Sequence, residues 1–186
     1  TGVQTCALPI CYQRFEQSKV LSFVPPDGAF KLMNYRSKGQ LALPVLVRPQ
    51  IQFLHGTGRV NVSVATRVPD KQLDDVLVTI PFPKVVGGNN LTTNVGSVQF
   101  DDNTKVCRWR VGKLPRGKTA VLEGSVNLDV NQPPPENKPV LQVDFKVLMH
   151  TTSGLRVDSV VLHNEKYKPF KGVRSVSKAG KFHVRS

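Results

Sequence analysis

The 186-residue sequence lacks the parts that several classes of protein require. Its three cysteines, Cys6, Cys11 and Cys107, are an odd number without metal-ligand spacing, and its four histidines are scattered singly. No apolar run is long enough to span a bilayer, and the N-terminus has no charged segment followed by an apolar core. We therefore expect a soluble, cytosolic protein with reduced thiols and no metal site.

Groups with catalytic spacing are also scarce. Asp74-Asp75 and Asp101-Asp102 are adjacent pairs, and neighbouring side chains of a strand point to opposite faces, so turns explain them better than paired acid–base groups do. Gly56-x-Gly58 lies between two strand patterns, which is the wrong context for a phosphate-binding loop. The sequence predicts neither an enzyme nor a cofactor.

Acidic residues are few. The chain has 13 Asp and Glu against 26 Lys and Arg, a formal net charge of +13. Such a balance suits a polyanionic partner, either nucleic acid or the anionic face of a membrane, and it does not choose between them. The closing segment has a single acid, Glu165, among the basic residues Lys166, Lys168, Lys171, Arg174, Lys178, Lys181 and Arg185. A solvated face that keeps the protein soluble explains such a cluster equally well.

The sequence is rich in turn residues and in segments where apolar and polar side chains alternate. Fourteen prolines and 14 glycines punctuate segments that alternate apolar and polar side chains about every ten residues, which predicts an all-β sandwich architecture. A hairpin is expected around Gly56–Gly58, and a loop at 87–90. Further strands are predicted at 76–81, 96–100, 105–111, 119–130 and 140–149, with a turn at 101–104 and a rigid loop at the triple proline, 133–135.

The only tryptophan bears on the nucleic-acid alternative. Binding of single strands requires aromatic rings interleaved with basic residues on an exposed sheet. Arg108-Trp109-Arg110 has that composition, yet alternation places the ring opposite the two guanidinium groups. We expect Trp109 to be a core residue, so nucleic-acid binding remains an alternative supported by charge alone.

The run Val20–Arg36 is the most specific feature of the chain. Pro25-Pro26-Asp27-Gly28 predicts a turn, and alternating apolar residues on both sides predict the strands of a hairpin. The full string resembles the signature Φ-x-F-Φ-P-P-x-G-x-F-x-L-x-x-Y-R of the mu homology domain. This domain is the cargo-binding module of the medium (mu) subunits of heterotetrameric vesicle-coat adaptor complexes.

A second match lies near the C-terminus. Ser153-Gly154-Leu155-Arg156-Val157 is similar to the family's Ser-Gly-Leu-Lys-Val, and 172–182 is similar to its closing Val-Arg-Tyr-Φ-x-x-x-Gly segment. The spelling of 165–173 resembles the mu subunit of the third adaptor complex in particular. The resemblance covers 11–186 and is collinear.

The resemblance implies an elongated domain of two β-sandwich subdomains, the second inserted in the first. By this reading 11–43 and 152–186 belong to the first subdomain, and 44–151 form the inserted second one. Residues 1–10 match nothing in the family and are expected to be foreign or unstructured. Family members carry further strands before residue 11, so we expect a C-terminal fragment whose first sandwich is truncated.

The resemblance also implies peptide recognition. Mu subunits bind cytosolic tails of membrane cargo bearing Tyr-x-x-Φ, where Φ is a bulky apolar residue, and the tail lies extended along a strand. The implied partners are such tails, the two large and one small subunits of an adaptor complex, and acidic membrane lipids as a further candidate; nucleic acid is not expected. The implied location is cytoplasmic, peripheral on Golgi, endosomal and transport-vesicle membranes that lead to lysosome-related compartments.

Five residues are carried over from the family's site. Val157 and Val160, on the Ser-Gly-Leu-Arg-Val strand, and Val173 match positions lining the apolar pocket, although valines spaced in this way are more often plain core. Arg174 matches the arginine whose flat guanidinium packs on the cargo tyrosine. Gly172 replaces a tryptophan of many mu subunits, which leaves the pocket less walled. The aromatic and aspartate that receive the tyrosine lie on an early strand that this chain lacks.

Overall fold

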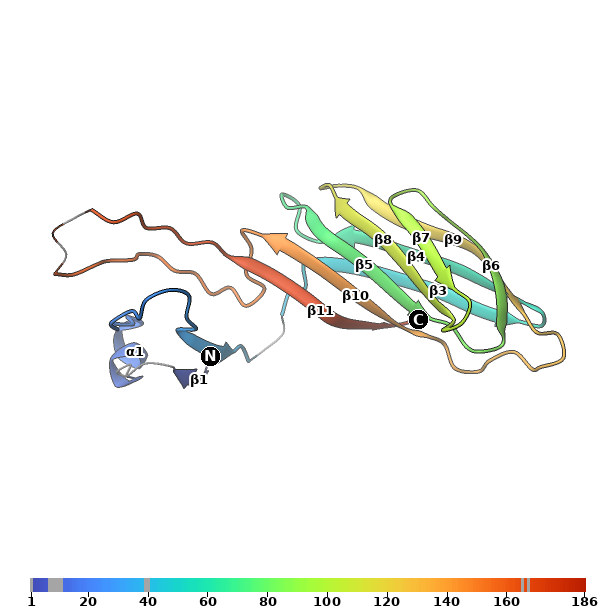
Figure 1. Ribbon diagram of the computed structural model, residues 1–186, viewed down its shortest axis with the longest axis horizontal. Helices are drawn as coiled ribbons and strands as arrows, with labels where there is room; N and C mark the ends of the chain where they lie inside the picture. Colours follow the sequence, from blue (N-terminus) through green and yellow to red (C-terminus); the bar gives the residue numbers. More distant parts are fainter. Residues whose placement is uncertain (1, 7–11, 39–40, 165, 167) are drawn as a thin grey trace. The chain divides into compact units, whose positions relative to one another are not determined.

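In the computed structural model, almost all of the regular secondary structure is β-strand (Figure 1). Eleven strands and one helix are formed by the described residues, which are 2–6, 12–38, 41–164, 166 and 168–186. Contacts divide the chain into two compact units, Thr1–Leu41 and Ala42–Ser186. The prediction of an all-β protein is confirmed.

The first unit contains β1 (Gly2–Cys6), α1 (Tyr12–Ser18) and β2 (Met33–Arg36). The helix, which the alternation did not predict, ends where Lys19 takes a φ of 58° and donates its N–H to the Phe15 carbonyl oxygen at 2.9 Å. β1 pairs with β2 in antiparallel fashion. Residues 2–6 therefore form a strand, whereas we expected 1–10 to be foreign or unstructured; that they are foreign stays a prediction.

The predicted Pro-Pro-Asp-Gly turn is present without its hairpin. Gly28 has a φ of +78°, and the rings of Phe23 and Phe30 on either side meet edge to face at 5.9 Å. The segment 19–32 nevertheless forms neither helix nor strand. The hairpin prediction is wrong because β2 takes β1 as its partner and two consecutive prolines remove N–H donors before the turn.

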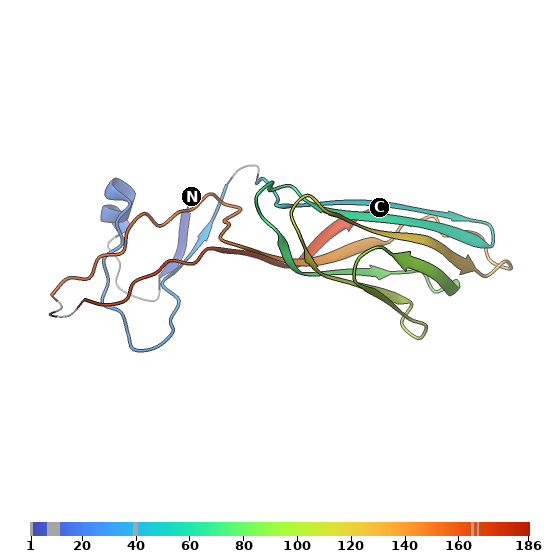
Figure 2. The same cartoon turned by 90° about the horizontal axis from the view of Figure 1, so that it is seen from above.

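The second unit consists of a five-stranded and a four-stranded sheet. The first has the order β11-β10-β5-β8-β7 and the second β3-β4-β9-β6. Their bounds are β3 Val45–Leu54, β4 Thr57–Thr66, β5 Leu73–Pro81, β6 Val86–Thr93, β7 Ser97–Asp101, β8 Val106–Leu114, β9 Thr119–Leu128, β10 Val140–Leu148 and β11 Val176–Arg185. Figure 2 shows the two sheets as two layers, with β3 and β4 (cyan to teal) in one and β10 (orange) in the other.

The inner faces of both sheets supply one hydrophobic core. Alternate residues of each strand are buried, among them Val62 and Leu122 of the four-stranded sheet and Val78 and Val143 of the other. This period of two is what an apolar face against a second sheet requires. The second unit is thus a β-sandwich.

Two predicted hairpins are confirmed. β3 and β4 pair from Val45↔Thr66 to Leu54↔Thr57, so that the connection has two residues, with Gly56 at a φ of +74°. β7 and β8 flank the turn predicted at 101–104, in which the Asp101 carboxylate accepts hydrogen bonds from the backbone of Asn103 and the hydroxyl of Thr104. These bonds hold the pKa of Asp101 below its usual value.

The loop predicted at 87–90 is wrong. These residues belong to β6, which pairs with β9 at the edge of the four-stranded sheet. Glycine and asparagine disfavour strands as isolated residues, and here the neighbouring strand overrides that preference.

The last strand closes the five-stranded sheet. β11 pairs with β10 along its whole length, from Val140↔Arg185 to Leu148↔Val176. Residues 176–185 therefore share a sheet with β5 and β8. The assignment of 152–186 to a truncated first sandwich, with 44–151 inserted, stays a prediction.

Candidate functional site

All five residues carried over from the family lie between β10 and β11. We call 154–164 the first arm and 168–175 the second arm; the first holds Val157 and Val160, and the second holds Gly172, Val173 and Arg174. Both views show the chain leaving the sandwich at the end of β10 and returning to it as β11 (Figures 1 and 2). The arms thus spring from two adjacent, paired strands.

Hydrogen bonds of the buried Ser177 side chain join the segment just before the first arm to the start of β11, just after the second arm. We call these two ends the roots of the arms. The hydroxyl of Ser177, which is 9% exposed, donates to the His150 carbonyl oxygen at 3.0 Å and accepts from the Thr152 N–H at 3.1 Å. The Thr152 hydroxyl lies 3.0 Å from the Ser177 hydroxyl oxygen. Beside it the Met149 N–H donates to the Ser175 carbonyl oxygen at 2.8 Å. We call these contacts the Ser177 clasp.

The first arm begins with a turn. The Gly154 N–H donates to the Thr151 carbonyl oxygen at 3.1 Å, the Thr151 hydroxyl donates to the Leu155 carbonyl oxygen at 2.9 Å, and Gly154 takes a φ of +75°. Ser153-Gly154 thus forms a turn, and the strand predicted to carry Val157 and Val160 is not assigned. A strand needs a hydrogen-bonded neighbour, and in the described part of the chain the first arm pairs with none.

The predicted site residues are exposed. Val157, Val160 and Val173 are 50%, 44% and 47% exposed, and Arg174 is exposed as well. These valines are therefore not buried by the described part of the chain, and their role in a peptide site stays a prediction. A Cβ on Gly172 would meet only the edge of the Phe170 ring, at 3.8 Å, so the position has room for a side chain.

Sequence reasoning missed three apolar side chains of the arms. Val161, Leu162 and Phe170 are 61%, 41% and 101% exposed. The signal was the break in alternation at Val160-Val161-Leu162, which places apolar side chains on both faces of an extended chain. The arms present exposed apolar groups and the cation of Arg174, a combination that can bind an apolar or aromatic ligand.

Cys107, which we expected to be a reduced thiol, is a free cysteine buried in the core. Burial raises the pKa of Cys107 to about 12, so this cysteine is a thiol at neutral pH. Among the described residues no cluster of His, Cys, Asp or Glu could hold a metal ion. In the same part of the chain no helix reaches the length and hydropathy of a bilayer span.

Trp109 is a core residue, as predicted. Its side chain is fully buried, and its indole N–H donates to the Val95 carbonyl oxygen at 3.0 Å. Arg108 and Arg110 are exposed on the opposite face of β8. Arg108, Trp109 and Arg110 therefore form no stacking platform, and net charge alone still supports the nucleic-acid alternative.

Comparison with known families gives a match over nearly the whole chain. The adaptor complexes medium subunit family matches residues 4–186, so the match begins within the segment 1–10, which we expected to match nothing in the family. The chain belongs to this family. Its members are adaptor subunits and not enzymes, which agrees with the prediction of no catalytic activity.

Curated relatives of this medium-subunit chain include mu subunits of the third adaptor complex. The AP-3 complex subunit mu of Dictyostelium discoideum is 46% identical over 182 residues, covering 94% of this chain and 43% of the relative. The AP-3 complex subunit mu-1 of Homo sapiens is 43% identical over 182 residues, covering 95% and 44%. The chain thus spans less than half the length of these relatives.

Solved structures with low sequence identity share the fold. A homology model of the full-length AP-3 complex in an intermediate open conformation aligns with a TM-score of 0.54 at 16% identity, covering 89% of this chain and 49% of the other. The yeast delta-COP-I mu-homology domain aligns with a TM-score of 0.51 at 16% identity, covering 79% and 60%. These likenesses concern the all-β fold.

Proposed function

We propose that this chain serves in vesicle trafficking as the cargo-recognition part of an adaptor-complex mu subunit, and that it binds Tyr-x-x-Φ signals in the cytosolic tails of membrane proteins. The observation that carries the proposal is the exposed apolar surface of the arms, with Arg174 beside it, in a member of the medium subunit family. Large exposed apolar patches in soluble proteins mark binding sites.

The arms suit an extended peptide. A cargo tail would lie along them, with its Φ side chain against Val157, Val160 and Val173 and its tyrosine ring on the guanidinium of Arg174. Backbone groups of the arms, which pair with no strand in the described part of the chain, would supply hydrogen bonds. Gly172 leaves one side of the apolar pocket open, which allows a range of Φ residues.

Assembly and location follow from the same proposal. The subunit would act with two large and one small adaptor subunit on the cytoplasmic face of Golgi, endosomal and transport-vesicle membranes, in transport to lysosome-related compartments. Its net charge of +13 suits an acidic membrane surface. Acidic lipid is therefore a proposed second contact.

Peptide titration tests the site. The assay uses the chain extended upstream by the strands that the resemblance implies, with a Tyr-x-x-Φ peptide and a Tyr→Ala version of it. The expected dissociation constant is around micromolar, because a short extended peptide buries little area and must be ordered on binding. Val157→Asp places a charge in the apolar pocket and Arg174→Ala removes the tyrosine contact, so each should weaken binding about tenfold or more.

Matched controls separate the site from general effects. Val130→Asp changes a valine that is 63% exposed outside the arms, and Arg108→Ala removes an exposed arginine of β8 that lies away from the end of β10 next to the arms; both should bind like the parent. Gly172→Trp should tighten binding by walling the pocket. The proposal fails if the arm variants melt like the parent and bind the peptide equally well.

A further inference from the structure

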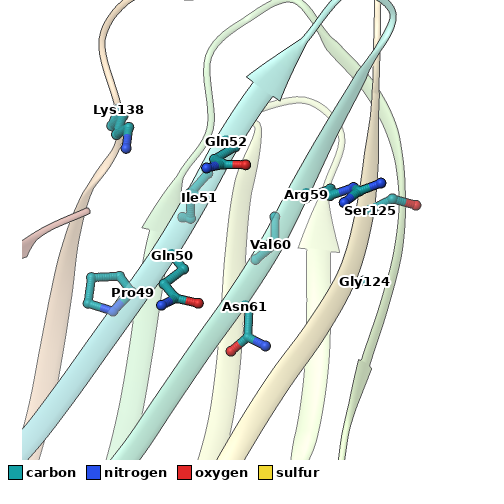
Figure 3. Close-up of a pocket in the computed structure, with 10 residues that line it drawn as sticks. All are labelled: Pro49, Gln50, Ile51, Gln52, Arg59, Val60, Asn61, Gly124, Ser125 and Lys138. Carbon is teal, nitrogen blue, oxygen red and sulfur yellow. The ribbon is translucent and has the colours of Figure 1, made fainter.

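A polar groove crosses the outer face of the four-stranded sheet, away from the arms. It has a volume of about 660 Å³ and is lined by β3, β4, β9 and one residue of the β9–β10 connection (Figure 3). Its polar side chains are those of Gln50, Gln52, Arg59, Asn61, Ser125 and Lys138. Neither the sequence patterns nor the proposed cargo site accounts for this set.

Strand alternation builds the groove. The Ile51 and Val60 side chains are buried in the core, at 0% and 2% exposure, so the residues on either side of them face outward. Gln50 lies opposite Asn61, and Gln52 lies opposite Arg59. The outer surface at this point is therefore a continuous polar array on two paired strands.

The six polar side chains satisfy none of one another's hydrogen-bonding groups. In the described part of the chain none of them makes a side-chain hydrogen bond or an ion pair, although cross-strand neighbours are close enough to pair. These groups are therefore free to bond to solvent or to a ligand. A ligand that replaced the solvent would find three amides, each able to donate and to accept.

The charge of the groove has one sign. Arg59 and Lys138 lie on opposite sides of it with Gln52 between them, as Figure 3 shows, and no acidic residue lines it. The nearest acid in the strand register is Glu123, which faces Asn61 from β9 outside the lining. The groove thus fits a ligand with negative charges at separated positions.

We propose that this groove is a docking site for an extended, acidic polypeptide segment. Carboxylates of the segment pair with Arg59 and Lys138, while its peptide groups bond to Gln50, Gln52 and Asn61. The amides favour a peptide over a phosphate headgroup, because a peptide backbone offers both donors and acceptors whereas a phosphate mainly accepts. The site is separate from the arms, so it does not depend on the proposed cargo function.

The test uses a labelled peptide of alternating Glu and Ser, capped at both ends, with a Lys–Ser peptide as its opposite. Fluorescence anisotropy at low salt should show binding of the Glu–Ser peptide alone. Arg59→Gln and Lys138→Gln should each weaken it about tenfold, because each removes one charge-assisted contact. Gln52→Leu should weaken it about threefold without any change of charge.

Arg110→Gln is the matched control, since it removes one exposed cation from the other sheet. It should bind the Glu–Ser peptide within twofold of the parent. Equal losses in Arg110→Gln and Arg59→Gln would reduce the effect to net charge and overturn the proposal, as would the absence of binding by the parent. Vesicles containing phosphatidylserine that compete through Arg59 and Lys138 more strongly than the peptide would assign the groove to a membrane surface instead. Thermal melts confirm that each variant is folded.

Discussion

Gly96, just before β7, occupies a backbone position that has no space for a side chain. Its φ is +81°, and a Cβ would collide with the Arg110 carbonyl oxygen and lie 2.8 Å from the Val111 Cα. Gly117 shares the left-handed conformation, with a φ of +70°, and has open space around the same point. Substitutions at the two glycines can therefore distinguish the cost of backbone strain from the cost of a steric collision.

We expect Gly117→Ala to lower the free energy of unfolding by about 1 kcal/mol, the cost of a left-handed alanine. Gly96→Ala should lower it by about 3 kcal/mol or more, because β7 must also move away from β8. Urea titration of both variants beside the parent measures the difference. Equal losses would mean that the backbone near Gly96 relaxes freely.

Local chemistry decided which individual residues could be predicted. The faces of Trp109 and its neighbours were correctly predicted, because alternation on a central strand leaves one choice of face. The exposure of Val157, Val160 and Val173 could not be read in the same way. The same spacing of valines fits a buried strand and an exposed arm equally well. Only the segments that pack against the valines in the folded protein decide between the two.

Among the elements, the arms depend on the Ser177 clasp at their roots. Ser177→Ala leaves the Thr152 N–H without its acceptor and the His150 carbonyl oxygen without its donor, both near a buried position. A buried polar group left without a hydrogen-bond partner lowers the free energy of unfolding by about 1 to 3 kcal/mol. We therefore predict lower stability and faster amide hydrogen exchange at Thr152, with little change at Val78 in the sandwich core.

The control for the clasp is Ser159→Ala, an exposed serine of the first arm with no hydrogen bond in the described part of the chain. It should leave both measurements unchanged. If Ser177→Ala also exchanges at the parent rate at Thr152, the turn at Thr151–Leu155 alone holds the arm.

Strand pairing explains which elements could be predicted. In the β3–β4 and β7–β8 hairpins the turn residues lie between the two strands that pair, so the local sequence is enough to predict each hairpin. β6 and β2 instead owe their strand form to partners distant in the chain, β9 and β1. Turn chemistry such as Gly87-Gly88 or Pro25-Pro26 misleads when the deciding partner is remote.

Over the whole molecule, the high net charge opposes self-association, whereas the exposed apolar side chains favour it. The net charge of +13 keeps copies of the chain apart, while Phe170, at 101% exposure, and Val161 favour association. Raising the salt concentration screens the repulsion and leaves the apolar attraction in place. We predict that the chain self-associates more strongly as salt is raised.

Sedimentation velocity at low and high salt measures this association. Phe170→Ser should reduce the associated fraction at high salt, whereas Val24→Ser, which changes an 85% exposed valine of the first unit, should not. A monomer at every salt concentration would contradict the prediction. Equal effects of the two variants would place the contact outside the arms.

The attachment of the arms to two adjacent strands has a consequence for divergence within the family. Because β10 and β11 already hold the roots together, the arms act as one long loop, and the entropy of closing a loop rises only slowly with its length. Doubling such a loop costs about 0.6 kcal/mol. Residues of the arms can therefore be exchanged, added or lost while the strands of the sandwich keep their register. The sequence of the arms, and with it the choice of ligand, can thus diverge among family members without loss of the fold.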